Sequence, residues 1–235
     1  MTMPKYVAIA IDGPAGAGKT TQAKLLAKAL GYTYVDTGAL YRTLALHKVL
    51  TGQNDACLNY DSFPVVEELL DTAQITFGYN GQTDQRVYLN GRDVTNEIRT
   101  PEISAMASRL SAIPAVRAHL LDMQRNEALS GNVVMEGRDI GTVVLPDAQH
   151  KFYLTADPLI RAYRRGKEMR EAEQTFDPVD LVKGIMERDY NDSHRETAPL
   201  KIAKGACVVD CSELTIKETT RTLLAIIALN NQPEA

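Results

Sequence analysis

The stretch from Gly13 to Thr20 constrains this chain more than any other, because it fits the pattern G-x-x-x-x-G-K-[ST] at every fixed position. Glycines permit the positive φ angles that turn several backbone N–H groups toward a phosphate. Lys19 supplies a compact charge for the β- and γ-phosphates, and the Thr20 hydroxyl can bind Mg²⁺. We therefore predict that a nucleoside triphosphate contacts Gly13, Pro14, Ala15, Gly16, Ala17, Gly18, Lys19, Thr20 and Thr21.

The residues around this loop support the prediction. Residues 6–11 form a short apolar run that is typical of a buried parallel strand. After Lys19, apolar residues recur at helical spacing as far as Leu30, and Gly31 can end that helix. A glycine-rich turn that matched the pattern by chance would need none of this context, so we favour a phosphate-binding loop between a strand and a helix.

Composition describes an ordinary globular chain. The 235 residues suffice for one large domain, 44% of them are apolar, and the net charge is −4. This charge gives no reason to expect binding to nucleic acid. We see no signal peptide and no apolar run long enough to cross a membrane. Three cysteines, Cys57, Cys207 and Cys211, form no C-x-x-C pair. We therefore expect a cytoplasmic protein with reduced cysteines, working as a monomer.

The rest of the chain predicts an α/β fold with a doubly wound, five-stranded parallel sheet. After the strand at 6–11, extended runs lie at 32–36, 132–136, 151–154 and 206–210, with helical patterns between them. Three alternating runs at 74–79, 86–90 and 92–95, the last two joined by Asn90-Gly91, predict a small antiparallel sheet. We divide the chain into a kinase-type core (1–62, 101–163 and 185–235), an inserted subdomain (63–100) and a helical lid (164–184).

Arginines gather in the second half of the chain. Arg161, Arg164 and Arg165 share one helical face, as do Arg188 and Arg195 with Asp192 on the next helix. A solvated face with salt bridges would explain either group alone. Two such groups in a phosphate-binding chain favour a clamp on phosphoryl oxygens, because phosphoryl transfer needs dense positive charge.

Glu136 ends a predicted strand, so its carboxylate is expected to face the phosphate loop. It can bind the water shell of Mg²⁺, as acids do at this place in phosphate-loop enzymes. A capping or ion-pairing carboxylate is an equally good interpretation of the same position. The sequence leaves both possibilities open.

Three functions compete at this point. A GTPase switch predicts an N-K-x-D motif for reading the base, and the chain has none. A kinase of an unphosphorylated metabolite leaves Arg42, Arg138 and Arg195 without a use. These additional cations favour a second phosphate and therefore a nucleoside monophosphate as acceptor. CMP, UMP and AMP are all acceptors of that kind.

Several motifs together resemble the bacterial cytidylate kinases, in order and over nearly the whole chain. They are IDGPAGAGK at 11–19, DTGALYR at 36–42, GRDIGTVV at 137–144, ERD at 187–189, and Arg195 with APL at 198–200. The resemblance implies transfer of the γ-phosphoryl group of ATP to CMP or dCMP, with Mg²⁺ accompanying ATP. The insertion after residue 62 also resembles that family's monophosphate-binding subdomain.

The same resemblance assigns roles to individual residues. It implies that Lys19 and Thr20 hold the ATP phosphates and Mg²⁺, with Glu136 reaching the metal through water. Thr37 stands where serine is common in the family, and Glu136 stands where aspartate is expected. The implied catalytic residues are Lys19, Arg138, Arg161, Arg164, Arg165 and Arg195. The implied CMP-binding residues are Thr37, Arg42, Ser108, Arg117, Arg138, Asp139, Arg188, Asp192 and Arg195.

Overall fold

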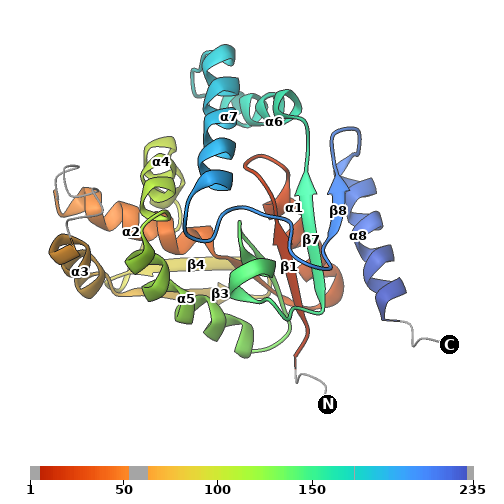
Figure 1. The fold of residues 1–235 in the computed structure, drawn as a ribbon, viewed down its shortest axis with the longest axis horizontal. Coiled ribbons are helices and arrows are strands. Elements are labelled where there is room, and N and C mark those ends of the chain that lie inside the picture. Colours follow the sequence, from red (N-terminus) through yellow and green to blue (C-terminus); the bar gives the residue numbers. More distant parts are fainter. Residues whose placement is uncertain (1–5, 53–62, 172, 232–235) are drawn as a thin grey trace.

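The computed structural model describes residues 6–52, 63–171 and 173–231. Its main sheet has five parallel strands in the order β2-β6-β1-β7-β8, which confirms the predicted fold class (Figure 1). The strands are β1 (Ala8–Asp12), β2 (Thr33–Asp36), β6 (Val133–Glu136), β7 (His150–Thr155) and β8 (Cys207–Asp210). Glu136 is in register with Ile11 on one side and with Asp36 on the other, so β1, β2 and β6 end at one edge.

Eight α-helices are present in the described part of the chain. They are α1 (Lys19–Leu30), α2 (Gly38–Leu50), α3 (Phe63–Thr72), α4 (Pro101–Leu110), α5 (Pro114–Leu129), α6 (Pro158–Glu171), α7 (Pro178–His194) and α8 (Ile216–Asn230). The starts of α4 and α7 are each capped by a side chain. The Thr100 hydroxyl accepts a bond from the Ile103 N–H at 3.2 Å, and the Asp177 carboxylate accepts from the Val179 N–H at 2.7 Å.

The inserted sheet has the predicted three antiparallel strands: β3 (Ile75–Asn80), β4 (Asp84–Leu89) and β5 (Arg92–Asp93). Asn90 and Gly91 have φ angles of 49° and 80°, as a tight hairpin turn with Asn-Gly requires. The third strand is shorter than the predicted run 92–95. The Thr95 hydroxyl accepts the N–H of Val87 at 2.9 Å, so a side chain replaces the backbone as a partner there.

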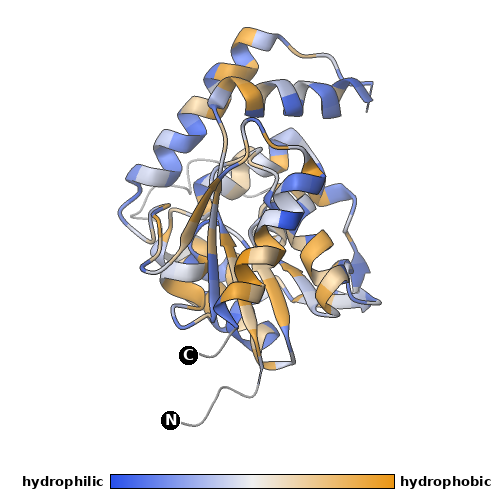
Figure 2. Cartoon of the chain, turned by 90° about the vertical axis from the view of Figure 1, so that its right-hand side faces the viewer, coloured by the Kyte–Doolittle hydropathy of each residue, from blue (hydrophilic) through white to orange (hydrophobic). Residues whose placement is uncertain are grey.

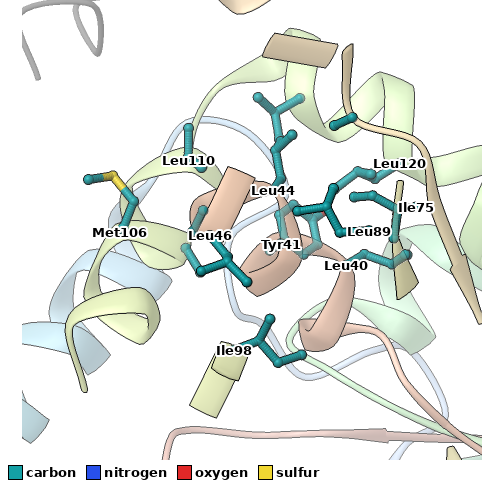
Figure 3. Packing of buried hydrophobic residues seen from close by; sticks show 14 of the residues in the cluster. Leu40, Tyr41, Leu44, Leu46, Ile75, Leu89, Ile98, Met106, Leu110 and Leu120 are labelled. Carbon is teal, nitrogen blue, oxygen red and sulfur yellow. The ribbon is translucent and has the colours of Figure 1, made fainter. Parts of the chain in front are cut away.

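Two large apolar clusters hold these layers together. One cluster packs α1 and α8 against the main sheet, with Leu26, Phe152 and Leu223 among its buried residues. The other joins α2, α4 and α5 to the inserted sheet and α3. Figure 3 shows this second cluster, to which α2 contributes Leu44 and α5 contributes Leu120. The insertion therefore shares its core with helices on both sides of it in the sequence.

Hydrogen bonds also join the inserted sheet to the edge of the main sheet. The Gln85 side chain accepts the Asp36 N–H at 2.7 Å, and the Tyr34 N–H donates to the Gln82 carbonyl at 2.8 Å. Asp36 is the last residue of β2, next to the start of α2. The insertion therefore supports the end of β2 at the edge where the predicted ligand-binding residues gather.

The pair α6 and α7 projects beyond the carboxyl edge of the main sheet (Figure 1). Figure 2 shows a largely apolar sheet, whereas blue hydrophilic residues alternate with orange ones along these two helices. Phe176 packs closely against Gly166, where an added Cβ would approach the ring to 2.8 Å. The two helices therefore form a hairpin in which Phe176, just before α7, packs against α6.

Two remaining features concern the membrane and the cysteines. Among the described helices, none is long and apolar enough to span a bilayer. Cys207 and Cys211 are free thiols. Cys57 lies outside the described residues.

Candidate active site

One cleft lies at the carboxyl edge of β1, β2 and β6, and helices α1, α2, α4, α5, α6 and α7 border it. Its cationic lining residues are Lys19, Arg42, Arg99, Arg117, Arg138, Arg165, Arg188 and Arg195. Its acidic lining residues are Asp36, Glu136, Asp139 and Asp192. A cleft with twice as many cations as carboxylates is suited to a ligand that carries several negative charges.

The phosphate loop occupies one end of this cleft. Gly13 has a φ of 146°, and a Cβ there would lie 1.9 Å from the carbonyl oxygen of Leu154 in β7. Gly16 and Gly18 have φ angles of 74° and 88°, a region that side chains rarely allow. The loop thus needs glycine both for its backbone shape and for its close approach to the next strand.

Lys19 is the cation of this loop. Its side chain is buried, and Nζ donates a hydrogen bond to the Pro14 carbonyl at 2.7 Å. Burial, followed by the nearby charge of Arg138, lowers the pKa of Lys19 to about 7. An anion beside Nζ would favour the charged form again, so the ammonium is placed where a bound phosphate would stabilise it.

Glu136 lies beside this lysine at the end of β6. The Tyr34 hydroxyl donates to its carboxylate at 2.6 Å, and the Thr37 hydroxyl donates to its backbone carbonyl at 2.8 Å. Burial raises the pKa of Glu136, and the charge of Asp36 acts in the same direction. The predicted orientation of Glu136 toward the phosphate loop is thus seen in the structure.

A cluster of arginines follows in the middle of the cleft. Arg42 donates to Asp36 at 2.6 Å, and Arg138 donates to Asp192 at 2.7 Å. The Nε atoms of Arg42 and Arg188 are both buried and have no hydrogen-bond partner within the described chain. Burial and the charge of Arg138 lower the pKa of Arg188 to about 10. A buried guanidinium N–H without a protein partner can donate to an anionic ligand at this place.

The far end of the cleft is built around Asp139. Its carboxylate pairs with Arg117, whose guanidinium also lies over the Tyr41 ring, 5.6 Å from the ring centroid. Arg195 lies 4.0 Å from Asp139 and 4.0 Å from Asp192, between this pair and the arginine cluster. The structure therefore brings together all the predicted CMP-binding residues, and Ser108 of α4 also lines the cleft.

The three arginines of α6 occupy different environments. Arg161 is 3% exposed and donates to the carbonyls of Ala156 at 2.8 Å and Ala15 at 3.0 Å. Its remaining nitrogen pairs with Asp189 of α7, so Arg161 ties the phosphate loop to α7. Arg164 donates to the Cys211 carbonyl at 2.5 Å, away from the cleft lining. Arg165 lines the cleft and pairs with Glu168 at 3.0 Å.

Sequence reasoning missed two charged residues of the cleft, Asp36 and Arg99. Asp36 holds Arg42, and Arg99 approaches the same carboxylate at 3.8 Å. The position of Asp36 at a strand end was a usable signal, because Glu136 was found on the same grounds. Arg99 belongs to a short 3-10 turn (Glu97–Arg99) after the inserted sheet, and no local pattern marks it.

Comparison with known proteins agrees with this geometry. The family model described as cytidylate kinase matches residues 9–229. A cytidylate kinase of Pelotomaculum thermopropionicum is 42% identical over 96% of this chain and 98% of its own length. One of Caldicellulosiruptor saccharolyticus is 45% identical over 94% and 96% of the two chains. One of Thermosipho melanesiensis is 47% identical over 93% and 95%. The chain therefore belongs to the cytidylate kinase family.

Proposed function

We propose that this enzyme transfers the γ-phosphoryl group of ATP to CMP or dCMP, giving ADP and CDP or dCDP. The observation that carries the proposal is the single cleft that runs from Lys19, past the unpaired Nε of Arg188, to the Asp139–Arg117 pair. Such a cleft offers a triphosphate site, a second anion site and a polar site for a base, in that order. A triphosphate alone would leave the last two unused.

The donor end acts by positioning and by electrostatic stabilisation. The backbone N–H groups of the loop and Lys19 would hold the β- and γ-phosphates of ATP. The charges of Arg138 and Arg188 both act on the pKa of Lys19, so these guanidinium groups lie near its ammonium group. They would stabilise negative charge on the transferred phosphoryl group. Arg165 lines the same cleft from the lid side. Arg161 and Arg164 would contribute through the position of α6, given their backbone partners.

The residues present fit a magnesium ion. Thr20 and Glu136 provide a hydroxyl and a carboxylate next to each other, which are the hard oxygen donors that Mg²⁺ prefers. Mg²⁺ commonly uses one or two protein oxygens together with water and nucleotide phosphates, so no larger set of acids is needed. The metal would neutralise charge on the phosphates. Tyr34 would fix the orientation of Glu136 toward it through its 2.6 Å bond.

The acceptor end would bind CMP through its phosphate, ribose and base. We assign the phosphate to Arg42, Arg138 and Arg195, with the Thr37 hydroxyl nearby. We assign the ribose to Arg188 and Asp192. Arginine suits the first role because its planar guanidinium can make two parallel bonds to phosphoryl oxygens.

The base would be read by Asp139, Arg117 and Ser108. Cytosine carries a donating amino group at C4, whereas uracil carries an accepting carbonyl there. A carboxylate accepts hydrogen bonds and does not donate them, so Asp139 suits cytosine and is repelled by uracil O4. Arg117 donates to cytosine O2 and N3, whereas N3 of uracil bears a hydrogen. Two mismatched contacts, at about 1–3 kcal/mol each, should separate CMP from UMP by several kcal/mol.

A panel of acceptors tests the proposal. We expect the highest kcat/KM with CMP and dCMP when ADP formation from ATP is followed with CMP, dCMP, UMP, AMP and cytidine. UMP should be about 10²-fold poorer or worse, because of the two mismatched contacts. Cytidine should give no turnover above background, since it lacks the anion for the arginine cluster. Equal use of CMP and UMP, or of CMP and cytidine, would refute the assignment.

Assembly and location complete the proposal. The cleft already contains donor and acceptor groups from one chain, so a second copy is not needed for catalysis. We therefore propose that the enzyme works as a monomer. We also propose that it works in the cytoplasm. Light scattering at assay concentration tests the first statement, and fractionation of the source cells tests the second.

A further inference from the structure

Asp12 is a buried carboxylate that the mechanism above does not use. It is the last residue of β1, directly before Gly13 of the phosphate loop, and is 2% exposed. One carboxylate oxygen accepts the N–H of Ile140, and the other accepts the N–H of Gly141, each at 2.7 Å. The carboxylate thus joins the base of the phosphate loop to the chain just after Arg138 and Asp139.

The two N–H groups belong to the start of a helical turn. Residues Ile140–Val144 form a π-helical turn, and the first amides of any helical turn have no partner inside it. Such amides are usually capped by the side chain of the residue that precedes the turn. Asp139 occupies that position and is a favourable capping residue, but its side chain makes no capping bond. Its carboxylate pairs with Arg117 in the cleft instead.

We propose that Asp12 is a positioning residue for acceptor recognition. It caps the 140–144 turn in place of Asp139 and thereby leaves the Asp139 carboxylate available to Arg117 and the base. It also sets the distance between the phosphate loop and residues 138 and 139, because it directly precedes the loop and accepts the N–H groups of Ile140 and Gly141, the next two residues of the chain. This inference rests on the proposed function for the statement that Asp139 reads the base.

The electrostatics of Asp12 agree with a role beyond stability. Burial is the main cause that raises its pKa to about 6, and the charge of Asp139 adds to it. The Gly141 and Ile140 amides and the charge of Lys19 act in the opposite direction. Burying an ionised carboxylate costs free energy, so stability of the fold alone does not favour one at this position. The two backbone hydrogen bonds of Asp12 instead fix the position of the turn that begins at Ile140.

Asp12→Asn tests the proposal with little change in volume. The amide can accept one backbone N–H, but its NH₂ group faces the other, so one cap is lost. Asp139 is then free to turn toward the uncapped amide, and Arg117 loses its partner. We expect KM for CMP to rise about 10-fold or more and the CMP-to-UMP ratio of kcat/KM to fall about 10-fold. KM for ATP should change less than about 3-fold, because the loop's own N–H groups and Lys19 remain.

Matched variants separate this role from a merely structural one. Gln149→Ala removes another side-chain bond to the backbone of β1, at the Ala8 N–H (2.7 Å), but at the opposite end of the strand. It should leave both KM values and the base preference unchanged. In an Asp139→Ala background, Asp12→Asn should cause no further loss of the CMP-to-UMP ratio. An unchanged ratio in the single variant, or an equal further loss in the double variant, would overturn the proposal.

Two further measurements keep the test decisive. Amide hydrogen exchange without any nucleotide should accelerate at Ile140 and Gly141 in Asp12→Asn, whatever the acceptor of the enzyme is. If that variant does not fold, Gly141→Ala strains the same contact, because its Cβ would lie 3.3 Å from Asp12 Oδ2 and 3.1 Å from the Ala203 Cβ. It should reduce the CMP-to-UMP ratio too, and an unchanged ratio would contradict the proposal.

The same data distinguish a failure of this inference from a failure of the proposed function. If the wild type does not prefer CMP over UMP, the proposed function fails. In that case the KM values of the wild type and of Asp12→Asn are compared for ATP and for the acceptor that the enzyme does use. A rise of KM for that acceptor alone supports the positioning role of Asp12, and unchanged KM values refute it. If the wild type prefers CMP but Asp12→Asn keeps that preference, the inference alone fails.

Discussion

The phosphate loop and the acceptor pocket are both suited to binding anions, but they are built in different ways. The loop is one continuous stretch, residues 13–20, in which glycine conformations fix the backbone and Lys19 bonds to a backbone carbonyl. The acceptor pocket is built from side chains of α2, α4, α5 and α7, of Arg195 just after α7, and of the turn after β6. Three of its arginines are paired with carboxylates: Arg42 with Asp36, Arg117 with Asp139, and Arg138 with Asp192.

This difference shows what each kind of site needs when no ligand is bound. A backbone cradle keeps its shape without counter-charges, because the φ angles of its glycines determine where the N–H groups point. Long arginine side chains would instead repel one another or turn toward water. Carboxylate partners hold them in place and reduce the cost of burying their charge. The acceptor pocket therefore requires precise pairing, and the loop requires precise backbone geometry.

The largest expected effect is at the loop. Lys19→Ala should leave the fold intact and lower kcat by about 10²–10³-fold, because charge that develops on the transferred phosphoryl group loses a preorganised partner. Steady-state kinetics with CMP, together with a melting curve, would measure this. Lys28→Ala, in the last turn of the same helix, is the matched control and should behave as wild type. Near-normal turnover by folded Lys19→Ala would contradict the role given to the loop cation.

The next effect concerns the acceptor pocket. Asp139→Ala should lower kcat/KM for CMP by about 10–100-fold and for UMP much less, because a carboxylate suits the cytosine amino group and opposes uracil O4. Asp147→Ala, an exposed acid shortly after the same turn, serves as control. The structure pairs Asp139 with Arg117, whereas Arg138 pairs with Asp192. If CMP and UMP fall by the same factor, Asp139 does not read the base and acts by holding Arg117.

The smallest effect concerns the lid, which contributes Arg165 to the cleft lining. We expect amide hydrogen exchange between Arg164 and Gly184 to slow several-fold when both nucleotides bind, because closure over ATP excludes water. Arg165, 40% exposed and paired with the exposed Glu168, is available to follow a ligand. Peptides from β3 and β4 should change less, since that sheet is already packed in the large core. Equal protection of the lid with and without nucleotides would count against its closure.

The sequence predicted most elements of the fold because their signals are local. The strand–loop–helix around Lys19 and the hairpin turn at Asn90-Gly91 each depend on residues a few positions apart. The predicted bounds of an element were wrong where a residue outside the local pattern supplied a hydrogen bond. The third strand of the insertion ends at Asp93, before the predicted end at Thr95, and the Thr95 hydroxyl instead accepts the N–H of Val87.

The sequence predicted most of the residues that belong to the candidate site, but it did not predict which of them contact one another. Family motifs identified the arginines, and the structure brings the acceptor set into one cleft. They did not show that Arg161 holds the Ala15 carbonyl, nor that Asp36 and Arg99 complete the pocket. They also did not show that Asp12 caps a turn that begins at Ile140. These contacts join residues far apart in the chain, and a local pattern contains no information about them.

The sequence by itself determined the phosphate loop, since its geometry follows from glycine φ angles and from a helix that starts at Lys19. It also determined the period of each helix and strand. The tertiary structure alone decided which charges face one another, because β6 lies between β1 and β2 and brings Glu136 and the Arg138–Asp139 pair to the loop. Coulombic attraction falls with distance through space rather than with separation along the chain, so pairs such as Arg138 and Asp192 exist only once the sheet and α7 are assembled.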